Sequence, residues 1–103
     1  MKIIAVTACA IGLAHTYMAG AALKKAAKEL GVEIKVETQG SMGIRDKITK
    51  QELQEAHVLI QAADIAILEP ERFKNIPILK VQTSKVIRKA KEIIQQAIDL
   101  QKS

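Results

Sequence analysis

The residue in this chain best suited to covalent chemistry is Cys9, the single cysteine among 103 residues. It follows an apolar run from Lys2 to Thr7 that has no helical periodicity, which predicts a buried strand. The segment from Leu13 to Leu30 is rich in alanine, leucine and lysine and predicts a helix, which Gly31 can end in a left-handed conformation. Unpaired N–H groups at a helix N-terminus stabilise a thiolate or a bound anion. Because the thiolate is the reactive form of cysteine, Cys9 is a candidate nucleophile.

The residues that follow Cys9 suit phosphate binding. A glycine allows a sharp turn and close approach of the backbone, and small alanines leave room for tetrahedral oxygens. We therefore predict a phosphate-binding loop that consists of Ala10, Ile11, Gly12, Leu13, Ala14, His15 and Thr16. His15 could assist proton or charge balance, although a structural hydrogen bond at the helix start is the favoured interpretation. The residues alone leave open that Cys9 is an inert buried thiol.

The next part of the chain predicts a strand, a loop and a short helix. Apolar and charged residues alternate from Val32 to Glu37, which predicts a strand at a sheet edge with one wet face that carries Glu37. Thr49 and Glu52 form a capping-box pattern that starts a short helix. Between the strand and this helix lies a glycine-rich loop formed by Gly40, Ser41, Met42 and Gly43.

Two more strands and a long helix complete the pattern. Strands are predicted from His57 to Ala62 and from Ile76 to Val81, and Ser84 is predicted to cap the C-terminal helix. The segment from Asp64 to Phe73 has no clear assignment. The alternation predicts an α/β fold with a small four-stranded parallel sheet, Rossmann-like and doubly wound, with helices on both faces. Ligands bind at the carboxyl ends of such strands, which is where Cys9 lies.

Composition excludes several classes of protein. The even composition of residues 1–103 predicts a single domain. One cysteine and two histidines are poor material for a closed zinc site, and we expect no metal and no cofactor. The net charge of +5 permits an acidic partner, but only Tyr17 and Phe73 could stack on bases, so we expect no nucleic-acid binding. Apolar stretches are short and no cleavage signal is visible, so we expect a cytoplasmic protein without membrane insertion.

The segment from Val6 to Met18 closely resembles the signature of the fructose-type enzyme IIB component of the phosphoenolpyruvate-dependent sugar phosphotransferase system (PTS). Further family landmarks follow in the expected order, namely Val36 to Ser41, Gly43, Thr49, Ala62 to Asp64, and Arg72 to Phe73 before Pro77. The chain departs from the family after the cysteine, where Ala10 and Ile11 replace the usual proline and threonine.

The resemblance implies a function, its partners and the roles of residues. Cys9 would become a transient phosphocysteine, with Ala10 to Thr16 as its cradle, and Gly40 to Gly43 would be a neighbouring loop that could contact a partner. A IIA domain would donate the phosphoryl group from a phosphohistidine, and a membrane IIC permease would hold the fructose-like sugar that receives it. The protein would then be a phosphocysteine–sugar phosphotransferase that associates with the inner face of the membrane through IIC.

Two alternatives come from other classes. A low-molecular-weight cysteine phosphatase also places a cysteine in a phosphate loop after its first strand. Such an enzyme needs an arginine to close the loop, where this chain has His15, and no aspartate stands out as a general acid. A non-catalytic regulatory module would merely hold an anion, an alternative that Ala10 and Ile11 keep open. No Walker or kinase signature is present, so direct transfer from a nucleotide is not expected.

Overall fold

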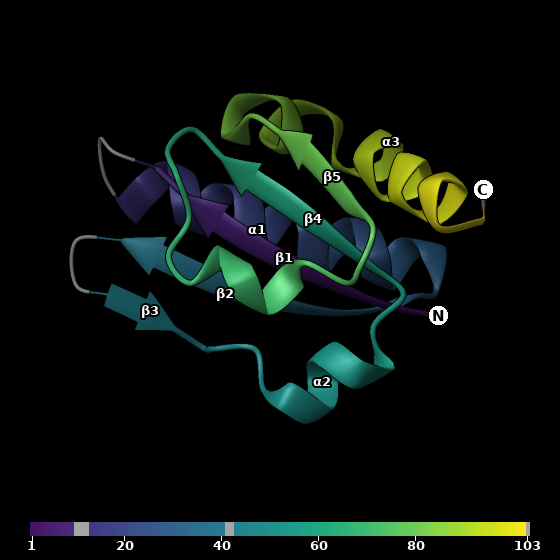
Figure 1. The fold of residues 1–103 in the computed structure, drawn as a ribbon. Coiled ribbons are helices and arrows are strands. Elements are labelled where there is room, and N and C mark those ends of the chain that lie inside the picture. The colour runs from purple at the N-terminus through teal and green to yellow at the C-terminus, as the bar shows by residue number, and fades with distance from the viewer. Residues whose placement is uncertain (10–12, 41–42, 103) are drawn as a thin grey trace.

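A computed structural model of the chain shows one sheet with helices on both faces (Figure 1). The structure describes residues 1–9, 13–40 and 43–102. The elements in chain order are β1 (Lys2–Ala8), α1 (Leu13–Leu30), β2 (Glu33–Gly40), β3 (Gly43–Arg45), α2 (Lys50–Glu55), β4 (Val58–Ala63), the 3₁₀ helix η1 (Pro70–Phe73), β5 (Ile78–Val81) and α3 (Thr83–Lys102). The strand order is β3-β2-β1-β4-β5, in which β1 is central.

The predicted α/β class is confirmed, but the sheet has five strands rather than four. β1, β2, β4 and β5 run parallel, and the additional β3 runs antiparallel to β2. The prediction that the second strand lies at a sheet edge is therefore wrong, because β3 pairs with the last three residues of β2 and is the outermost strand. Gly40 and Gly43 pair with each other across the β2–β3 hairpin. Ser41 and Met42 of the predicted loop lie outside the described residues.

The predicted bounds of the first helix are confirmed, but the predicted start of the last helix is wrong. α1 has the predicted bounds, and Gly31 after it has the left-handed φ of 72° that favours glycine at a helix end. Helix α3 begins at Thr83, so Ser84 lies inside the helix and the prediction that Ser84 caps it is wrong. The segment from Asp64 to Phe73, which the sequence left unassigned, contains only the short η1 helix.

The capping box at the start of α2 is present in both directions. The Glu52 backbone N–H donates to the Thr49 hydroxyl, and the Thr49 N–H donates to the Glu52 carboxylate. The pKa of Glu52 lies below its ordinary value, chiefly because of this bond from the Thr49 backbone. Together the two bonds satisfy donors that a helix start otherwise leaves unpaired.

Replacing Thr49 by alanine is expected to lower the free energy of unfolding by about 1 kcal/mol, because the cap bond to Glu52 is lost. Urea denaturation of the purified chain measures this loss. Ser84→Ala is the matched control, because Ser84 is an exposed hydroxyl in a first helical turn that does not cap it. The free energy of unfolding of Ser84→Ala is expected to stay within about 0.5 kcal/mol of the wild-type value. Equal losses in the two variants would contradict the assignment of the cap.

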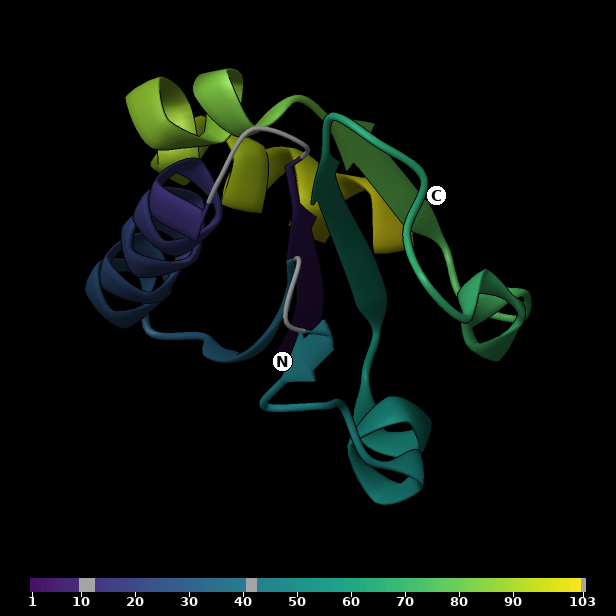
Figure 2. The same ribbon diagram turned by 90° about the vertical axis from the view of Figure 1, so that its left-hand side faces the viewer.

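Both faces of β1 are buried, and each faces a different core. Alternate residues such as Ile3 and Ala5 join a cluster with α1 and α3. The intervening Ile4 and Val6 join a second cluster that includes Phe73 of η1. Figure 2 shows α1 and α3 on one side of the sheet and α2 and η1 on the other. The central strand is thus fixed from both sides, which also fixes the position of the residue that follows it.

A buried ion pair ties the segment after β4 to β2. Arg72 donates two hydrogen bonds of 2.9 Å to the two oxygens of Glu37, whose side chain is fully buried. Gln39 and the Ile48 N–H also donate to this carboxylate. Gln39 in turn accepts a 2.7 Å bond from the Leu68 N–H. Glu37, which the alternating pattern placed on the wet face of the strand, is therefore a buried anchor.

Candidate functional site

Cys9 lies where the sequence placed it, between a buried strand and a helix. It follows Ala8, the last residue of the central strand β1, and α1 begins at Leu13. The thiol is free and only 9% exposed. Ala10, Ile11 and Gly12 lie outside the described residues, so this part of the predicted phosphate-binding loop stays a prediction.

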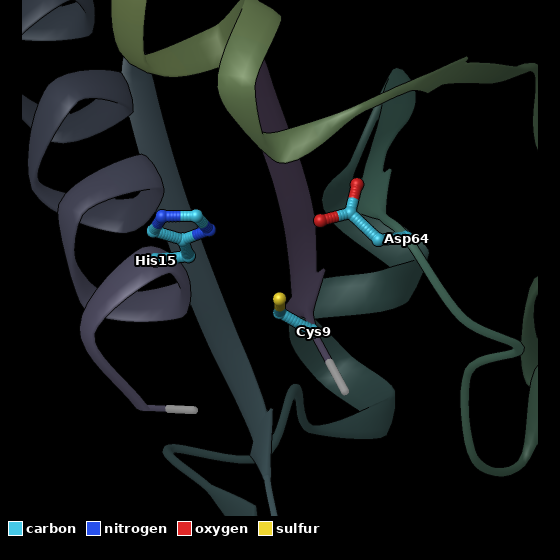
Figure 3. A group of neighbouring side chains, drawn as sticks. All are labelled: Cys9, His15 and Asp64. Atoms are coloured by element: carbon cyan, nitrogen blue, oxygen red, sulfur yellow. The ribbon is translucent and has the colours of Figure 1, made fainter. Parts of the chain in front are cut away.

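Three side chains from separate parts of the chain converge at Cys9. His15 comes from the first turn of α1, and Asp64 comes directly after β4 (Figure 3). The Cys9 sulfur, one imidazole nitrogen and one carboxylate oxygen all lie within 4.8 Å of one another. His15 and Asp64 are exposed, whereas Cys9 is buried. The sulfur therefore faces two polar groups that solvent and a partner can reach, rather than a sealed apolar interior.

The Asp64 carboxylate is held in place at the start of α3. The Thr83 hydroxyl donates a 2.6 Å bond to one of its oxygens, and the Thr83 N–H donates a 3.1 Å bond to the other. The Asp64 N–H also donates to the Ala8 carbonyl. The pKa of Asp64 lies below its ordinary value, chiefly because of the Thr83 hydroxyl, with smaller contributions from the Thr83 N–H, the Cys9 thiol and the charge of His15. The carboxylate is thus ionised and oriented beside the sulfur.

The remaining described residues of the predicted site take different positions. Leu13 and Ala14 lie in the first turn of α1, where the side chain of Ala14 is exposed. Thr16 is only 1% exposed, and its hydroxyl has no hydrogen-bond partner in the part of the chain that the structure describes. Gly40 follows Gln39, which pairs with Ala8 across the sheet, so the start of the β2–β3 hairpin lies at the same edge as Cys9.

The sequence analysis missed two residues of the site, Asp64 and Thr83. No aspartate stood out in the sequence as a general acid, and the structure places Asp64 beside the cysteine. Asp64 is 55 positions from Cys9 in the chain, and the parallel pairing of β1 with β4 brings the two together. One signal was available, since a polar residue directly after a buried parallel strand lies at the ligand-binding edge of such a sheet. Thr83 gave no comparable signal.

This arrangement defines a class of protein. A thiol follows the central strand of a parallel α/β sheet, precedes the N-terminus of the next helix, and has an imidazole and a carboxylate beside it. Such a site combines a nucleophile with groups that can exchange protons and balance the charge of an anion. The class is therefore an α/β protein that can carry a group on cysteine.

Comparisons with known proteins place the chain within this class. The family model described as "PTS system, Lactose/Cellobiose specific IIB subunit" matches residues 4–96. The fructose-like EIIB component 2 of Escherichia coli (strain K12) is 46% identical over 92% of this chain and 90% of its own length. The chain belongs to the PTS IIB family as a fructose-type IIB component. The resemblance found in the sequence is thereby confirmed.

Two further relatives extend the comparison. The fructose-specific EIIABC component of Bacillus subtilis (strain 168) is 54% identical over 95% of this chain. The chain spans 15% of the length of that relative and of a second EIIABC component. The solved structure of a domain of fruA from Bacillus subtilis has a TM-score of 0.88 and 51% identity, and the match covers 100% of this chain and 97% of that one. Among the described residues, none of the helices is long and apolar enough to cross a bilayer.

Proposed function

We propose that Cys9 accepts a phosphoryl group from the phosphohistidine of a IIA domain and passes it to a fructose-like sugar held by a membrane IIC permease. The observation that carries this proposal is the position of the Cys9 sulfur, at the carboxyl end of β1 beside His15 and Asp64. The EIIABC names of two relatives support IIA and IIC as partners. Contact with IIC would hold the chain at the cytoplasmic face of the membrane.

The first transfer forms a phosphocysteine. The thiol of Cys9 gives its proton to the Asp64 carboxylate, one oxygen of which lies within 4.8 Å of the sulfur. The thiolate then attacks phosphorus in line, so that the S–P bond forms and the P–N bond of the phosphohistidine breaks. The electron pair of that bond stays on the donor's imidazole nitrogen, which takes up the proton that Asp64 received from Cys9. His15 can donate a hydrogen bond to the phosphoryl group, because one of its ring nitrogens lies within 4.8 Å of the sulfur.

In the second transfer Cys9 is the leaving group instead of the nucleophile. A sugar hydroxyl attacks phosphorus, the O–P bond forms, and the S–P bond breaks with its electron pair returning to sulfur. The ionised Asp64 can take the hydroxyl proton, because it has by then released the proton it took from Cys9. One transfer is thus divided into two steps through a covalent intermediate, and both steps use the same three side chains.

The test is phosphoryl transfer from a phosphorylated fructose-type IIA domain, followed by mass spectrometry of the intact chain. The wild type is expected to gain one phosphoryl group and Cys9→Ala none. His57→Ala is the matched control and is expected to be labelled like the wild type. His57 is exposed at the other end of the sheet, where its Nδ1 accepts a 3.2 Å bond from the Lys2 N–H. Equal labelling of wild type and Cys9→Ala would overturn the assignment of Cys9.

A second candidate function, the cysteine phosphatase, gains one argument from the aspartate beside the cysteine. A phosphatase also needs an arginine that closes the phosphate loop. Arg72 is bound to Glu37, and Arg45 lies over the Tyr17 ring at 5.9 Å from its centroid. We therefore expect no hydrolysis of an aryl phosphate by the wild type beyond that by Cys9→Ala. Cysteine-dependent turnover of the aryl phosphate would favour the phosphatase instead.

A further inference from the structure

The cluster at Cys9 offers three metal-binding atoms of different kinds. Cysteine sulfur, histidine nitrogen and aspartate oxygen are all established ligands of Zn²⁺, which commonly takes three protein ligands and leaves a fourth position open. The atoms of Cys9, His15 and Asp64 lie within 4.8 Å of one another. The sequence argued against a closed zinc site because two histidines and one cysteine are too few ligands. The sequence does not indicate an open site with three ligands, because it does not show that Asp64 lies beside Cys9.

The geometry requires only small changes to hold an ion. Bonds of about 2.0–2.3 Å to a tetrahedral ion place the ligand atoms roughly 3.3–3.7 Å apart. The side chains come from the end of β1, from α1 and from the segment after β4, and they point into one shared space (Figure 3). His15 is exposed, so it can rotate toward an ion that enters from solvent, while Thr83 holds the exposed Asp64 carboxylate in place.

The surroundings of Asp64 resemble those of a metal ligand. Outer partners that orient a ligating carboxylate usually strengthen metal binding. Thr83 provides two such bonds, one to each oxygen of Asp64, and each oxygen keeps a lone pair for an ion. A thiolate together with an imidazole favours Zn²⁺ over Mg²⁺ and Ca²⁺, which prefer oxygen ligands.

We infer that Cys9, His15 and Asp64 form a binding site for Zn²⁺ or a similar borderline divalent cation, and that the bound ion blocks Cys9. The block follows because a thiolate that donates its electron pair to a metal cannot use it to attack phosphorus. Metal and phosphoryl group therefore compete for one sulfur, and the ion acts as a reversible inhibitor rather than a cofactor. Only this inhibition rests on the proposed phosphoryl transfer, while metal binding itself does not.

The binding test uses Cd²⁺ and Co²⁺ as optical probes of the purified, reduced chain. Wild type and His57→Ala are expected to bind one ion per chain and to show the charge-transfer absorption of a thiolate–metal bond. Cys9→Ser is expected to lose this absorption. His15→Ala and Asp64→Asn are expected to bind at least about 10–100-fold more weakly, since even the loss of an outer-shell partner has an effect of that size. Circular dichroism of every variant confirms that it folds.

Two results would overturn the inference. If His15→Ala and Asp64→Asn bind Cd²⁺ as tightly as the wild type, the thiolate holds the ion alone and there is no three-residue site. If Zn²⁺ binds but does not slow alkylation of Cys9 by iodoacetamide, the ion does not block the sulfur. Both measurements omit IIA, so their failure leaves the proposed phosphoryl transfer untouched. Failure of IIA to label the chain would likewise leave metal binding intact.

Discussion

Replacing Arg72 by methionine is expected to lower the free energy of unfolding by about 3–5 kcal/mol, because Glu37 would be left buried without its counter-charge. Glu37 is fully buried, and Arg72 contacts both of its oxygens at 2.9 Å. Methionine preserves much of the side-chain length and the packing near Phe73, over whose ring the Arg72 guanidinium lies. Urea denaturation of wild type and variant gives the difference directly.

An exposed ion pair in the same region provides the control. Lys47 lies 3.0 Å from Glu69, and both side chains are exposed. Lys47→Met is therefore expected to change stability by less than about 1 kcal/mol. Combining Glu37→Gln with Arg72→Met should restore part of the lost stability, because the unpaired charge is removed while the amide oxygen can still accept the Ile48 N–H. Equal losses in Arg72→Met and Lys47→Met would show that burial does not strengthen this pair.

The pH dependence of the same variant provides an independent check. Burial by itself would raise the pKa of Glu37, but hydrogen bonds from Arg72, Gln39 and the Ile48 N–H outweigh it and hold the pKa below the ordinary value. The contribution of Glu37 to stability is therefore complete above the ordinary glutamate pKa and is lost as the pH falls through the lower pKa of the folded chain. The difference in the free energy of unfolding between wild type and Arg72→Met should become smaller as the pH falls through that acidic range.

The parts of the fold that the sequence predicted correctly depend on local signals. The bounds of α1, the left-handed Gly31 and the Thr49–Glu52 box each involve residues that lie within one turn or one helix. β3 escaped prediction because three residues are too few to show a period of two. Glu37 was placed on the wet face because alternation reports only the side of a strand. Its partner Arg72 lies 35 residues away, and the sequence gives no sign of that contact.

The residues of the site likewise divide into those that local signals predicted and those that depend on contacts between distant parts of the chain. Cys9 could be identified because a buried strand, a short turn and a helix follow one another in the chain. His15 was identified as a candidate for charge balance, and its approach to Cys9 follows from its place in the first turn of α1. Asp64 and Thr83 depend on how β4 and α3 pack against β1 and α1, which the sequence does not specify. The position of the Cys9 sulfur was therefore predictable, whereas Asp64 and Thr83 could be placed beside it only from the tertiary structure.

Asp64→Asn is expected to slow transfer from phosphorylated IIA to Cys9 by about 10²-fold, because the amide cannot accept the thiol proton. This is the low end of the effect of a proton acceptor, since the lowered pKa of Asp64 makes the carboxylate a weak base. The carboxylate is positioned for this task by two bonds from Thr83, and one of its oxygens lies within 4.8 Å of the Cys9 sulfur. Rapid-quench measurement of phosphocysteine formation under single-turnover conditions gives the rate. His57→Ala, changed at the opposite end of the sheet, should keep the wild-type rate.

The pH profile separates proton transfer from a loss of structure. A thiolate needs no base, so at alkaline pH, where thiols ionise, the rate of Asp64→Asn should approach that of the wild type. Thr83→Val keeps the carboxylate but removes its hydroxyl partner, and it should slow transfer less than Asp64→Asn. A defect in Asp64→Asn that is the same at every pH would indicate a structural role for Asp64. Faster transfer in Asp64→Asn would show that the carboxylate acts mainly by repelling the incoming phosphoryl group, and would contradict its role as proton acceptor.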